Sequence, residues 1–337
     1  MAVHASGAGR SASDGRVRLI TKVAHMYHEQ GIRQADIADA LHISQTKVSR
    51  LLKRAGEIGI VRTVVVVSQG VHLTLEQALE DRYGLREAVV VDVEGDESEI
   101  IAGIGSAGAA YLESTLAGGE RIGISPWSQT LLSVAERLHP LRVAGADRVV
   151  QLVGGVGEGA VQAKANRLLG HLAELVGAEP LYVQAPGLVG TAEIRQSLVS
   201  DAAMQHVTEE WRSLTMALVG IGSVQPSPLL RDSGNAVAPA DQDHLIAAHA
   251  VGDVCQRFFD AGGELIHSDL NSRVVGIDPE VLRTIPRRIG MAGGARKHAA
   301  IRAAISGGWV NVVITDVTTA RALLDENQQA AGAGMAT

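Results

Sequence analysis

Several features are scarce in this chain of 337 residues, and each scarcity excludes a class of protein. Cys255 is the single cysteine, which excludes a disulfide framework and a metal site built from several cysteines. Aromatic residues make up 3%, whereas glycine (38 residues) and small aliphatic residues abound, a balance that suits α/β packing better than a β-sandwich. The histidines lack metal-ligand spacing, and the chain contains no nucleophile-elbow or Walker pattern. We therefore expect no metal, no cofactor and no catalytic residues.

Long apolar runs are also missing. No run reaches the roughly 20 residues that a membrane-spanning helix needs, and the chain does not open with a charged-then-apolar leader. With 46% apolar residues, the chain still has enough material for the cores of two or three domains. We expect a cytoplasmic protein.

Acidic residues are scarce in the first part of the chain. Residues 1–62 contain ten Lys/Arg against five Asp/Glu, whereas the remainder contains twenty against thirty-two. The net charge of −7 therefore combines a basic N-terminal part with an acidic body. Because DNA phosphates attract the first and repel the second, this division favours DNA contact confined to the N-terminal part.

Residues 33–54 predict two short helices joined by a tight turn, with Ser44 where an N-cap belongs. Apolar residues recur on one side of each helix, at Ile37, Ala38, Leu41, Val48, Leu51 and Leu52. This layout is typical of a helix-turn-helix whose second helix enters the major groove. The alternative is an ordinary helix pair with a solvated basic face. The short connection, the small Ala38 at the crossing and the lack of any acid between residues 44 and 54 favour DNA binding.

The residues expected to contact DNA place base-edge donors and acceptors at the start of the second helix and phosphate-seeking cations towards its end. They are Gln34, Ser44, Gln45, Thr46, Lys47, Ser49, Arg50, Lys53 and Arg54.

Composition and periodicity divide the chain into five segments. They are a disordered arm (1–15), a helix-turn-helix domain of the winged type (16–68), a linker helix (69–86), an effector domain (87–327) and a frayed tail (328–337). The β-branched run 63–67 resembles a short wing or a strand that leads out of this domain. Arg62 is a candidate for a contact with a backbone phosphate. The linker helix either packs on its own domain or forms a seam between subunits.

The body alternates short apolar strands with helices, which predicts a largely parallel sheet covered by helices on both faces. Strands are expected at 88–93, 121–124, 148–152, 181–183, 216–219, 274–277, 288–291 and 310–315. Helices are expected at 98–117, 128–138, 161–176, 243–257, 295–306 and 317–326. In such sheets a ligand binds outside the carboxyl ends of the strands.

Four turns at predicted strand ends indicate a ligand site there. They are residues 123–130, 152–157 (leading towards Asn166), 220–223 and 292–297. Each glycine turn alone is weak evidence, because tight strand-to-helix turns need glycine for steric reasons. Together, hydroxyls near one helix start and Lys297 in another predict a site for an anionic polyol.

Two further residues have two interpretations each, and a third, Cys255, has one. Asp253 stands among apolar neighbours and either caps local backbone or accepts hydrogen bonds from a ligand. Trp127 either stacks on a sugar face or fills the core. Cys255 packs around the site, since nothing beside it indicates a reactive thiolate.

With these features the chain resembles the SorC family, also called the SorC/DeoR type, of sugar-binding transcriptional regulators. The resemblance extends from about Arg16 to Leu324. Its most specific parts are residues 37–41 with 44–52, 252–260, and 293–301 followed by 314–316.

The resemblance implies an effector domain with the fold of sugar-phosphate isomerases and deaminases. It also implies a homo-oligomer, a dimer or tetramer, that binds double-stranded operator DNA under the control of a sugar, polyol or sugar phosphate. The effector-site residues are Ser125, Trp127, Ser128, Gln129, Thr130, Gly154, Gly155, Asn166, Asp253, Cys255, Gly293, Gly294 and Lys297. The turn 125–130 and Lys297 would hold the phosphate end, and Trp127, Asn166, Asp253 and Cys255 would line the sugar end.

The first turn departs from the family, because many relatives have a smaller Gly/Ser/Thr-rich loop there. Pro126 removes a backbone donor and Gln129 adds bulk, which leaves an unphosphorylated polyol as an alternative effector. A sugar-phosphate isomerase or deaminase with an accessory DNA-binding domain is a second possible function, with Asp253 and Lys297 as its acid/base pair. A nucleotide-binding oxidoreductase is disfavoured, because no Gly-x-Gly-x-x-Gly turn with a ribose-binding acid is present.

Overall fold

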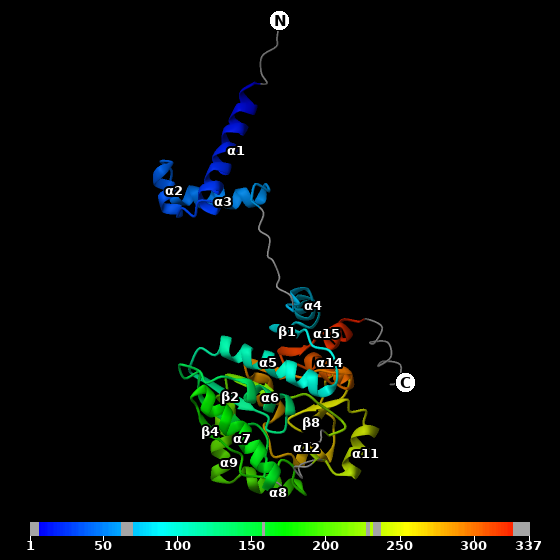
Figure 1. Cartoon of the computed structure of the whole chain (residues 1–337). Coiled ribbons are helices and arrows are strands. Elements are labelled where there is room, and N and C mark those ends of the chain that lie inside the picture. Colours follow the sequence, from blue (N-terminus) through cyan, green and yellow to red (C-terminus); the bar gives the residue numbers. More distant parts are fainter. Residues whose placement is uncertain (1–6, 62–69, 157–158, 227–229, 232–236, 326–337) are drawn as a thin grey trace. The chain divides into compact units, whose positions relative to one another are not determined.

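The computed structural model describes residues 7–61, 70–156, 159–226, 230–231 and 237–325. The backbone divides into two units, with the boundary between Val67 and Ser68. We call them the head and the body and describe each by itself (Figure 1).

The head is a bundle of three helices, α1 (Gly7–His28), α2 (Gln34–Ala40) and α3 (Gln45–Glu57). Val23, Ile37, Ala38 and Val48 are buried together at its centre, as the apolar spacing predicts. The expected disordered arm is wrong for residues 7–15, because α1 already begins at Gly7. Residues 1–6 and the run 63–67, expected to form a wing, lie outside the described residues, as does Arg62.

The turn between α2 and α3 fixes their crossing. His42 has a left-handed backbone (φ 53°), and the Ile43 N–H donates to the Ala38 carbonyl at 3.0 Å. Ser44 then caps α3, since its hydroxyl accepts the Lys47 N–H at 3.2 Å. The predicted helix-turn-helix is therefore formed as expected.

The body is an α/β domain of three layers. In chain order its elements are α4 (Leu73–Tyr83), β1 (Glu87–Val91), α5 (Glu97–Thr115), β2 (Glu120–Ile124), α6 (Gln129–Arg137), β3 (Ala146–Gln151), α7 (Gly159–Val176), β4 (Glu179–Leu181), α8 (Ala192–Val199), α9 (Ala202–Arg212), β5 (Met216–Val219), β6 (Gly222–Ser223), α11 (Pro239–Ala247), β7 (Gly252–Val254), β8 (Arg257–Phe259), α12 (Asp269–Arg273), α13 (Pro279–Thr284), β9 (Arg287–Met291), η1 (Ala295–Lys297), α14 (His298–Ser306), β10 (Val312–Asp316) and α15 (Val317–Leu324).

Among the described residues, seven strands pair in the order β1-β10-β9-β5-β2-β3-β4, and every pairing is parallel. Successive residues of a strand point to opposite faces, so Met216 and Leu218 join one core while Ala217 and Val219 join the other. Helices α5, α6 and α7 pack beside one another over the first face (Figure 1). Helices α9, α13, α14 and α15 contribute to the second. The predicted parallel α/β fold is confirmed.

Two expected elements are wrong. Residues 274–277 form isolated bridges from Val274 to Leu188 and from Gly276 to Val153, and they do not join the large sheet. The helix expected at 243–257 ends at Ala247, and the chain continues into the hairpin β7–β8. That hairpin pairs with β6 in a small antiparallel sheet. Apolar runs of this length do not distinguish a helix from buried strands, and tertiary packing decides.

Helix α4 packs on the body. Leu79 is fully buried in the second core. Strand β1 is the edge of the sheet, and two glutamates of α4 cover its outward N–H groups. Glu80 Oε1 accepts the Ala88 N–H and Glu76 Oε1 accepts the Val90 N–H, both at 2.9 Å. These contacts favour the interpretation that the linker helix belongs to its own domain, and they block the edge against pairing with another chain.

We expect Glu80→Ala to destabilise the body by about 1–3 kcal/mol, because it leaves the Ala88 N–H without its acceptor. Glu80→Gln keeps an acceptor oxygen and should lose much less. Trp127, Trp211 and Trp309 all lie in the body, so tryptophan fluorescence during urea unfolding reports on this unit. Equal losses for the two variants would contradict the role of Glu80 as an edge cover.

Candidate functional site

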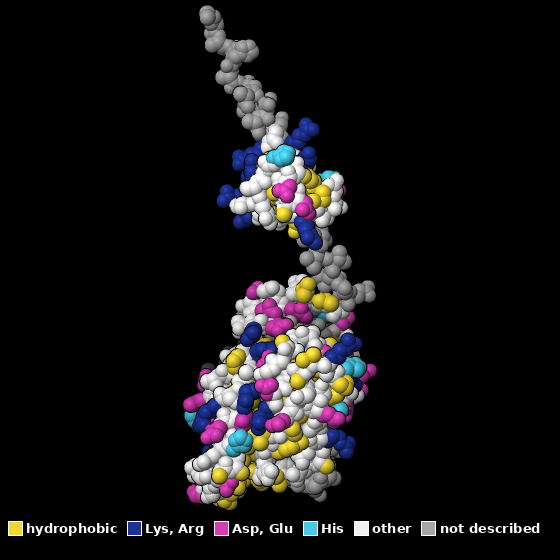
Figure 2. Space-filling view, turned by 90° about the vertical axis from the view of Figure 1, so that its left-hand side faces the viewer, with side chains coloured by type: hydrophobic (Ala, Val, Ile, Leu, Met, Phe, Trp, Pro, Cys, Tyr) yellow, Lys and Arg dark blue, Asp and Glu magenta, His cyan; other side chains and the backbone are white. Residues whose placement is uncertain are grey.

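The head exposes the polar face of the helix-turn-helix. Eight of the nine residues predicted to contact DNA are exposed, and Gln34 at the start of α2 is half-buried. Figure 2 shows Lys and Arg side chains at several points on one face of the head, with fewer acidic ones among them. The oxygen of Ser44 already accepts the Lys47 N–H, which leaves its O–H donor and one lone pair for DNA. Arg54 pairs with Glu57 at 2.8 Å, whereas Arg50 has no ion-pair partner among the described residues.

A pocket opens in the body where three parallel strands end. Strands β9, β5 and β2 are neighbours in the sheet, and the turns that follow them supply Lys297, residues 220–223 and residues 125–130. The small sheet β6–β7–β8 closes another side with Asp253, Cys255 and Gln256. The pocket and its open mouth together contain about 770 Å³ of space that no atom fills. Of the four turns predicted to converge, three supply polar lining residues, and the turn 152–157 supplies Val153 alone.

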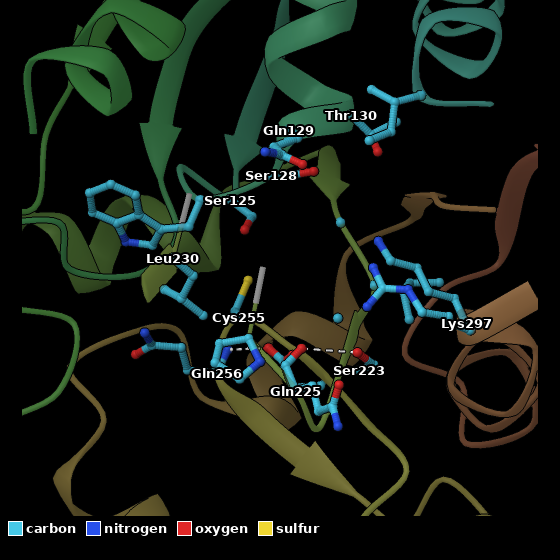
Figure 3. A pocket seen from close by; sticks show the side chains of 18 of the residues that line it. Ser125, Ser128, Gln129, Thr130, Ser223, Gln225, Leu230, Cys255, Gln256 and Lys297 are labelled. Atoms are coloured by element: carbon cyan, nitrogen blue, oxygen red, sulfur yellow. Dashed lines mark hydrogen bonds between the residues drawn. The ribbon is translucent and has the colours of Figure 1, made fainter. Parts of the chain in front are cut away.

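The polar side chains of the pocket face one another across it. In Figure 3, Ser128, Gln129 and Thr130 lie on one wall, and Ser223, Gln225 and Gln256 lie on the opposite wall. Ser125 and Cys255 lie between them, and Lys297 approaches from the side. Hydroxyl and amide groups both donate and accept hydrogen bonds, as do the hydroxyls of a sugar.

The turn of the β7–β8 hairpin consists of two residues in an unusual conformation. Cys255 and Gln256 both have left-handed backbones, with φ of 53° and 61°. This geometry suits the twist of a two-residue hairpin, but such turns normally contain glycine or asparagine. Side chains other than those cost of order 1–3 kcal/mol per residue there, and such strain is found at functional sites. Here it places Asp253, Cys255 and Gln256 together on the pocket wall.

Asp253 fulfils the first of the two roles considered for it, and its position leaves the second open. Its Oδ2 accepts the Gln256 N–H at 3.0 Å, which braces the hairpin turn, and the carboxylate also lines the pocket. Gly222 stands opposite it in β6, where a Cβ atom would collide with Asp253 Oδ1. Burial raises the pKa of Asp253 to about 6, although the Gln256 N–H and the charge of Lys297 both act to lower it.

Lys297 is the cation on the side of the pocket. Burial lowers its pKa, and the charges of Glu97 and Asp253 counteract that effect. Lys297 and Asp253 both line the pocket, and no ion pair joins them. Burial also raises the pKa of Cys255 to about 12, which keeps the thiol protonated and supports a packing role.

A second pair of oppositely charged side chains, Glu97 and Arg296, lines the pocket. Arg296 Nη2 is held by both carboxylate oxygens of Glu97, at 2.6 and 2.7 Å. Glu97 is the first residue of α5, and Arg296 lies in η1 before α14. Their side chains are 55% and 60% exposed respectively. The ion pair therefore joins two elements that are about 200 residues apart in the sequence.

Five of the thirteen predicted effector residues do not line the pocket. Asn166 is exposed on α7. Gly154 and Gly155 lie behind Trp127, where a Cβ would collide with Pro186 or approach Gln151. Gly293 and Gly294 do permit a close approach, but by Asp316, whose Oδ2 accepts the Gly294 N–H at 2.8 Å. These glycines have steric roles.

Trp127 lines the pocket but is mainly a core residue. The residue is 8% exposed, and its Nε1–H donates to the Gly154 carbonyl at 3.2 Å. The expected stacking on a sugar face is therefore not favoured. Sequence reasoning missed Glu97, Gln225 and Gln256. Gln256 was missed because a helix was expected at 243–257. Glu97 was missed because a glutamate in the first turn of a helix is common and does not by itself indicate a binding site.

Comparison with known proteins assigns the chain to a family. Residues 69–325 match the model of the family described as "Putative sugar-binding domain". The chain is 34% identical to the sorbitol operon regulator of Klebsiella pneumoniae, with 91% of this chain and 98% of that protein covered. It is 33% identical to the deoxyribonucleoside regulator of Bacillus subtilis, with 92% and 98% covered.

A solved structure agrees with these matches. The full-length sorbitol operon regulator SorC from Klebsiella pneumoniae superposes with a TM-score of 0.69 at 32% identity, covering 92% of this chain and 99% of that one. The chain belongs to the SorC family of sugar-binding transcriptional regulators. Membership of this family is consistent with the basic head and with the polar pocket of the body. No helix of the described residues is long and apolar enough to cross a membrane.

Asp253→Asn should stabilise the ligand-free protein at pH 7. The native carboxyl has its pKa raised from 3.8 to about 6, so ionisation is disfavoured in the folded state. The resulting penalty is absent below about pH 4, grows as the pH rises through about 6 and is complete above it. We expect a gain of about 1–3 kcal/mol at pH 7 and little at pH 4, measured by urea unfolding.

Asp243→Asn on the exposed face of α11 is the matched control and should show no such pH dependence. A stability difference between Asp253→Asn and the wild type that is equal at pH 4 and pH 7 would contradict the burial of the Asp253 charge.

Proposed function

We propose that this SorC-family regulator binds operator DNA through the polar face of its helix-turn-helix and releases or rearranges on it when a sugar, polyol or sugar phosphate occupies the body pocket. One observation carries the proposal: the walls of the pocket combine seven hydroxyl- or amide-bearing residues with two carboxylates, one lysine and one arginine at the carboxyl edge of a parallel sheet. The names of its relatives, a sorbitol operon regulator and a deoxyribonucleoside regulator, support an effector of this class.

We infer that the protein acts as a homo-oligomer on a palindromic operator, with two heads in successive major grooves. Effector binding would shift subunit packing and thereby the spacing of the heads. A coupling free energy of about 1–3 kcal/mol corresponds to a change in operator affinity of about 5–150-fold, which suffices for induction. Helix α4 is suited to transmit the shift, because it is fixed to β1 and directly follows the connection to the head.

We further infer that the pocket senses its ligand without converting it, as its relatives named above are regulators. An isomerase or deaminase would use Asp253 and Lys297 as its acid/base pair. Turnover of a pentose or amino-sugar phosphate by the purified full-length chain would contradict a purely sensory pocket.

Arg50→Ala should weaken operator binding by about 1–3 kcal/mol if Arg50 reads a base, because the bidentate donor is lost. Lys53→Ala should weaken binding to all DNA sequences alike, as expected for the loss of a phosphate contact. The slope of the logarithm of the binding constant against the logarithm of the salt concentration should become shallower by about one. Fluorescence anisotropy on operator and scrambled duplexes measures both effects.

Arg142→Ala removes the same charge from an exposed position of the body and serves as the control. Operator affinity that is unchanged in Arg50→Ala would remove the assignment of α3 as the recognition helix.

Lys297→Ala should abolish the response to the effector while operator affinity without effector stays at the wild-type level, because Lys297 lies in the body pocket. The measurement is operator release over an effector titration, with circular dichroism to verify folding. A variant that unfolds would assign Lys297 a structural role instead.

A further inference from the structure

The turn that carries Lys297 to the pocket has little stability of its own. It consists of Gly293, Gly294 and the short 3-10 helix η1. A helix of this length closes few hydrogen bonds, and here the Lys297 N–H donates to the Gly294 carbonyl at 2.9 Å. Gly294 also has a backbone (φ 90°, ψ 149°) that other residues rarely adopt. The position of Lys297 must therefore be fixed by contacts from other elements.

Two anchors hold this turn, and they differ in burial. The first is the ion pair of Arg296 with Glu97, whose side chains are 60% and 55% exposed. Such an exposed pair holds a geometry weakly, because water and salt screen it. The second anchor consists of Asp316 and Thr319 at the start of α15, and both are fully buried. The buried anchor therefore dominates.

The buried anchor grips the peptide group of Gly294. Its N–H donates to Asp316 Oδ2 at 2.8 Å and to Thr319 Oγ1 at 3.0 Å. The Thr319 hydroxyl in turn donates to the same Oδ2 at 2.6 Å. Gly293 lies so close that a Cβ atom there would collide with Asp316 Oδ2. Asp316 and Thr319 thus hold the N–H of Gly294, and the carbonyl of Gly294 receives the Lys297 N–H.

Capping of α15 accounts for only part of this arrangement. Asp316 is the N-cap residue, and its Oδ1 accepts the Thr319 N–H at 2.8 Å. The cap needs neither Oδ2 nor the Thr319 hydroxyl, and both of these contact the Gly294 N–H. A carboxylate wholly removed from water is costly unless it is hydrogen-bonded, so its donors are held firmly in place. The second oxygen and the hydroxyl therefore serve the turn.

We propose that Asp316 and Thr319 are positioning residues of the effector pocket, because their grip on the Gly294 N–H fixes the turn that places Lys297 at the cavity. Neither residue lines the cavity, so both act through Lys297. The inference rests on the proposed function for its consequence in effector binding. The geometry of the turn itself is testable without any ligand.

Asp316→Ser separates the cap from the turn. Serine caps helices about as well as aspartate, but the Thr319 N–H occupies its single oxygen and Gly294 loses an acceptor. We expect the Lys297 amide to exchange its hydrogen about 10-fold faster than in the wild type, as for the loss of a hydrogen bond to a charged acceptor. Amides of β10 and α15 should exchange at the wild-type rate. Hydrogen exchange on the full-length chain, resolved to single amides by mass spectrometry, measures these rates.

Thr319→Val removes the hydroxyl, keeps the shape of the side chain and leaves the backbone cap of α15 in place. The Lys297 amide should exchange about 3–10-fold faster in this variant, because one of the two acceptors of Gly294 is lost. Thr319→Ser keeps a hydroxyl and should restore the wild-type rate. Thr318→Val makes the same substitution at the preceding, exposed position of α15 and is the matched control.

Effector binding supplies the second readout. Isothermal titration calorimetry uses four probes of the proposed class: ribitol, D-sorbitol, D-ribose 5-phosphate and D-sorbitol 6-phosphate. For a probe that binds the wild type, Asp316→Ser and Thr319→Val should raise the dissociation constant about 3–10-fold, because Lys297 is less well placed. Operator affinity without effector should stay at the wild-type level.

Wild-type exchange of the Lys297 amide in both Asp316→Ser and Thr319→Val would overturn the inference, as would an equal change in Thr318→Val. Faster exchange throughout β10 and α15 in Thr319→Val would also overturn it, because the two residues would then only stabilise the fold. So would an unchanged dissociation constant for a probe that binds. Faster exchange of the Lys297 amide in a protein that binds none of the probes would keep the positioning role and count against the proposed effector class.

Discussion

The parallel register of β9, β5 and β2 is the constraint on which the effector pocket depends. Because these three strands are neighbours and run in one direction, the turns after them meet at one edge of the sheet. The strands are buried on both faces, so a slip of one residue would exchange the two cores and is strongly disfavoured. The positions of Ser125, Ser223 and Lys297 follow from that register.

The hairpin β7–β8 adds to this edge what the parallel sheet cannot provide. A parallel sheet supplies helix starts and glycine turns, which favour oxygen-rich and anionic ligands. The hairpin supplies a half-buried carboxylate, Asp253, held by a turn whose two residues have unfavourable backbones. Both features cost stability in the ligand-free protein. A ligand that donates hydrogen bonds to Asp253 recovers part of that cost, which couples occupancy of the pocket to the stability of the body.

The helix-turn-helix of the head was predictable because the sequence signals that specify it lie within a few residues of one another. Apolar spacing, one N-cap and the absence of acids from residues 44–54 were enough to identify the helix-turn-helix, and the structure reproduces its core and its cap. The parallel sheet was predictable for a similar reason, since runs such as 216–219 are apolar on both faces. The segment 243–257 was not, because an apolar stretch of that length suits a helix as well as a buried hairpin, and pairing with β6 decides.

The sequence by itself determined the basic head, the alternating architecture of the body and eight of the residues that line the pocket, because these depend on composition and on periodicity along the chain. Only the tertiary structure decided which glycine turns face a ligand and which face Asp316 or Trp127. It also decided that Glu97 holds Arg296. Contacts between residues so distant in the chain leave no local pattern, because they arise when strands far apart in sequence become neighbours in the sheet.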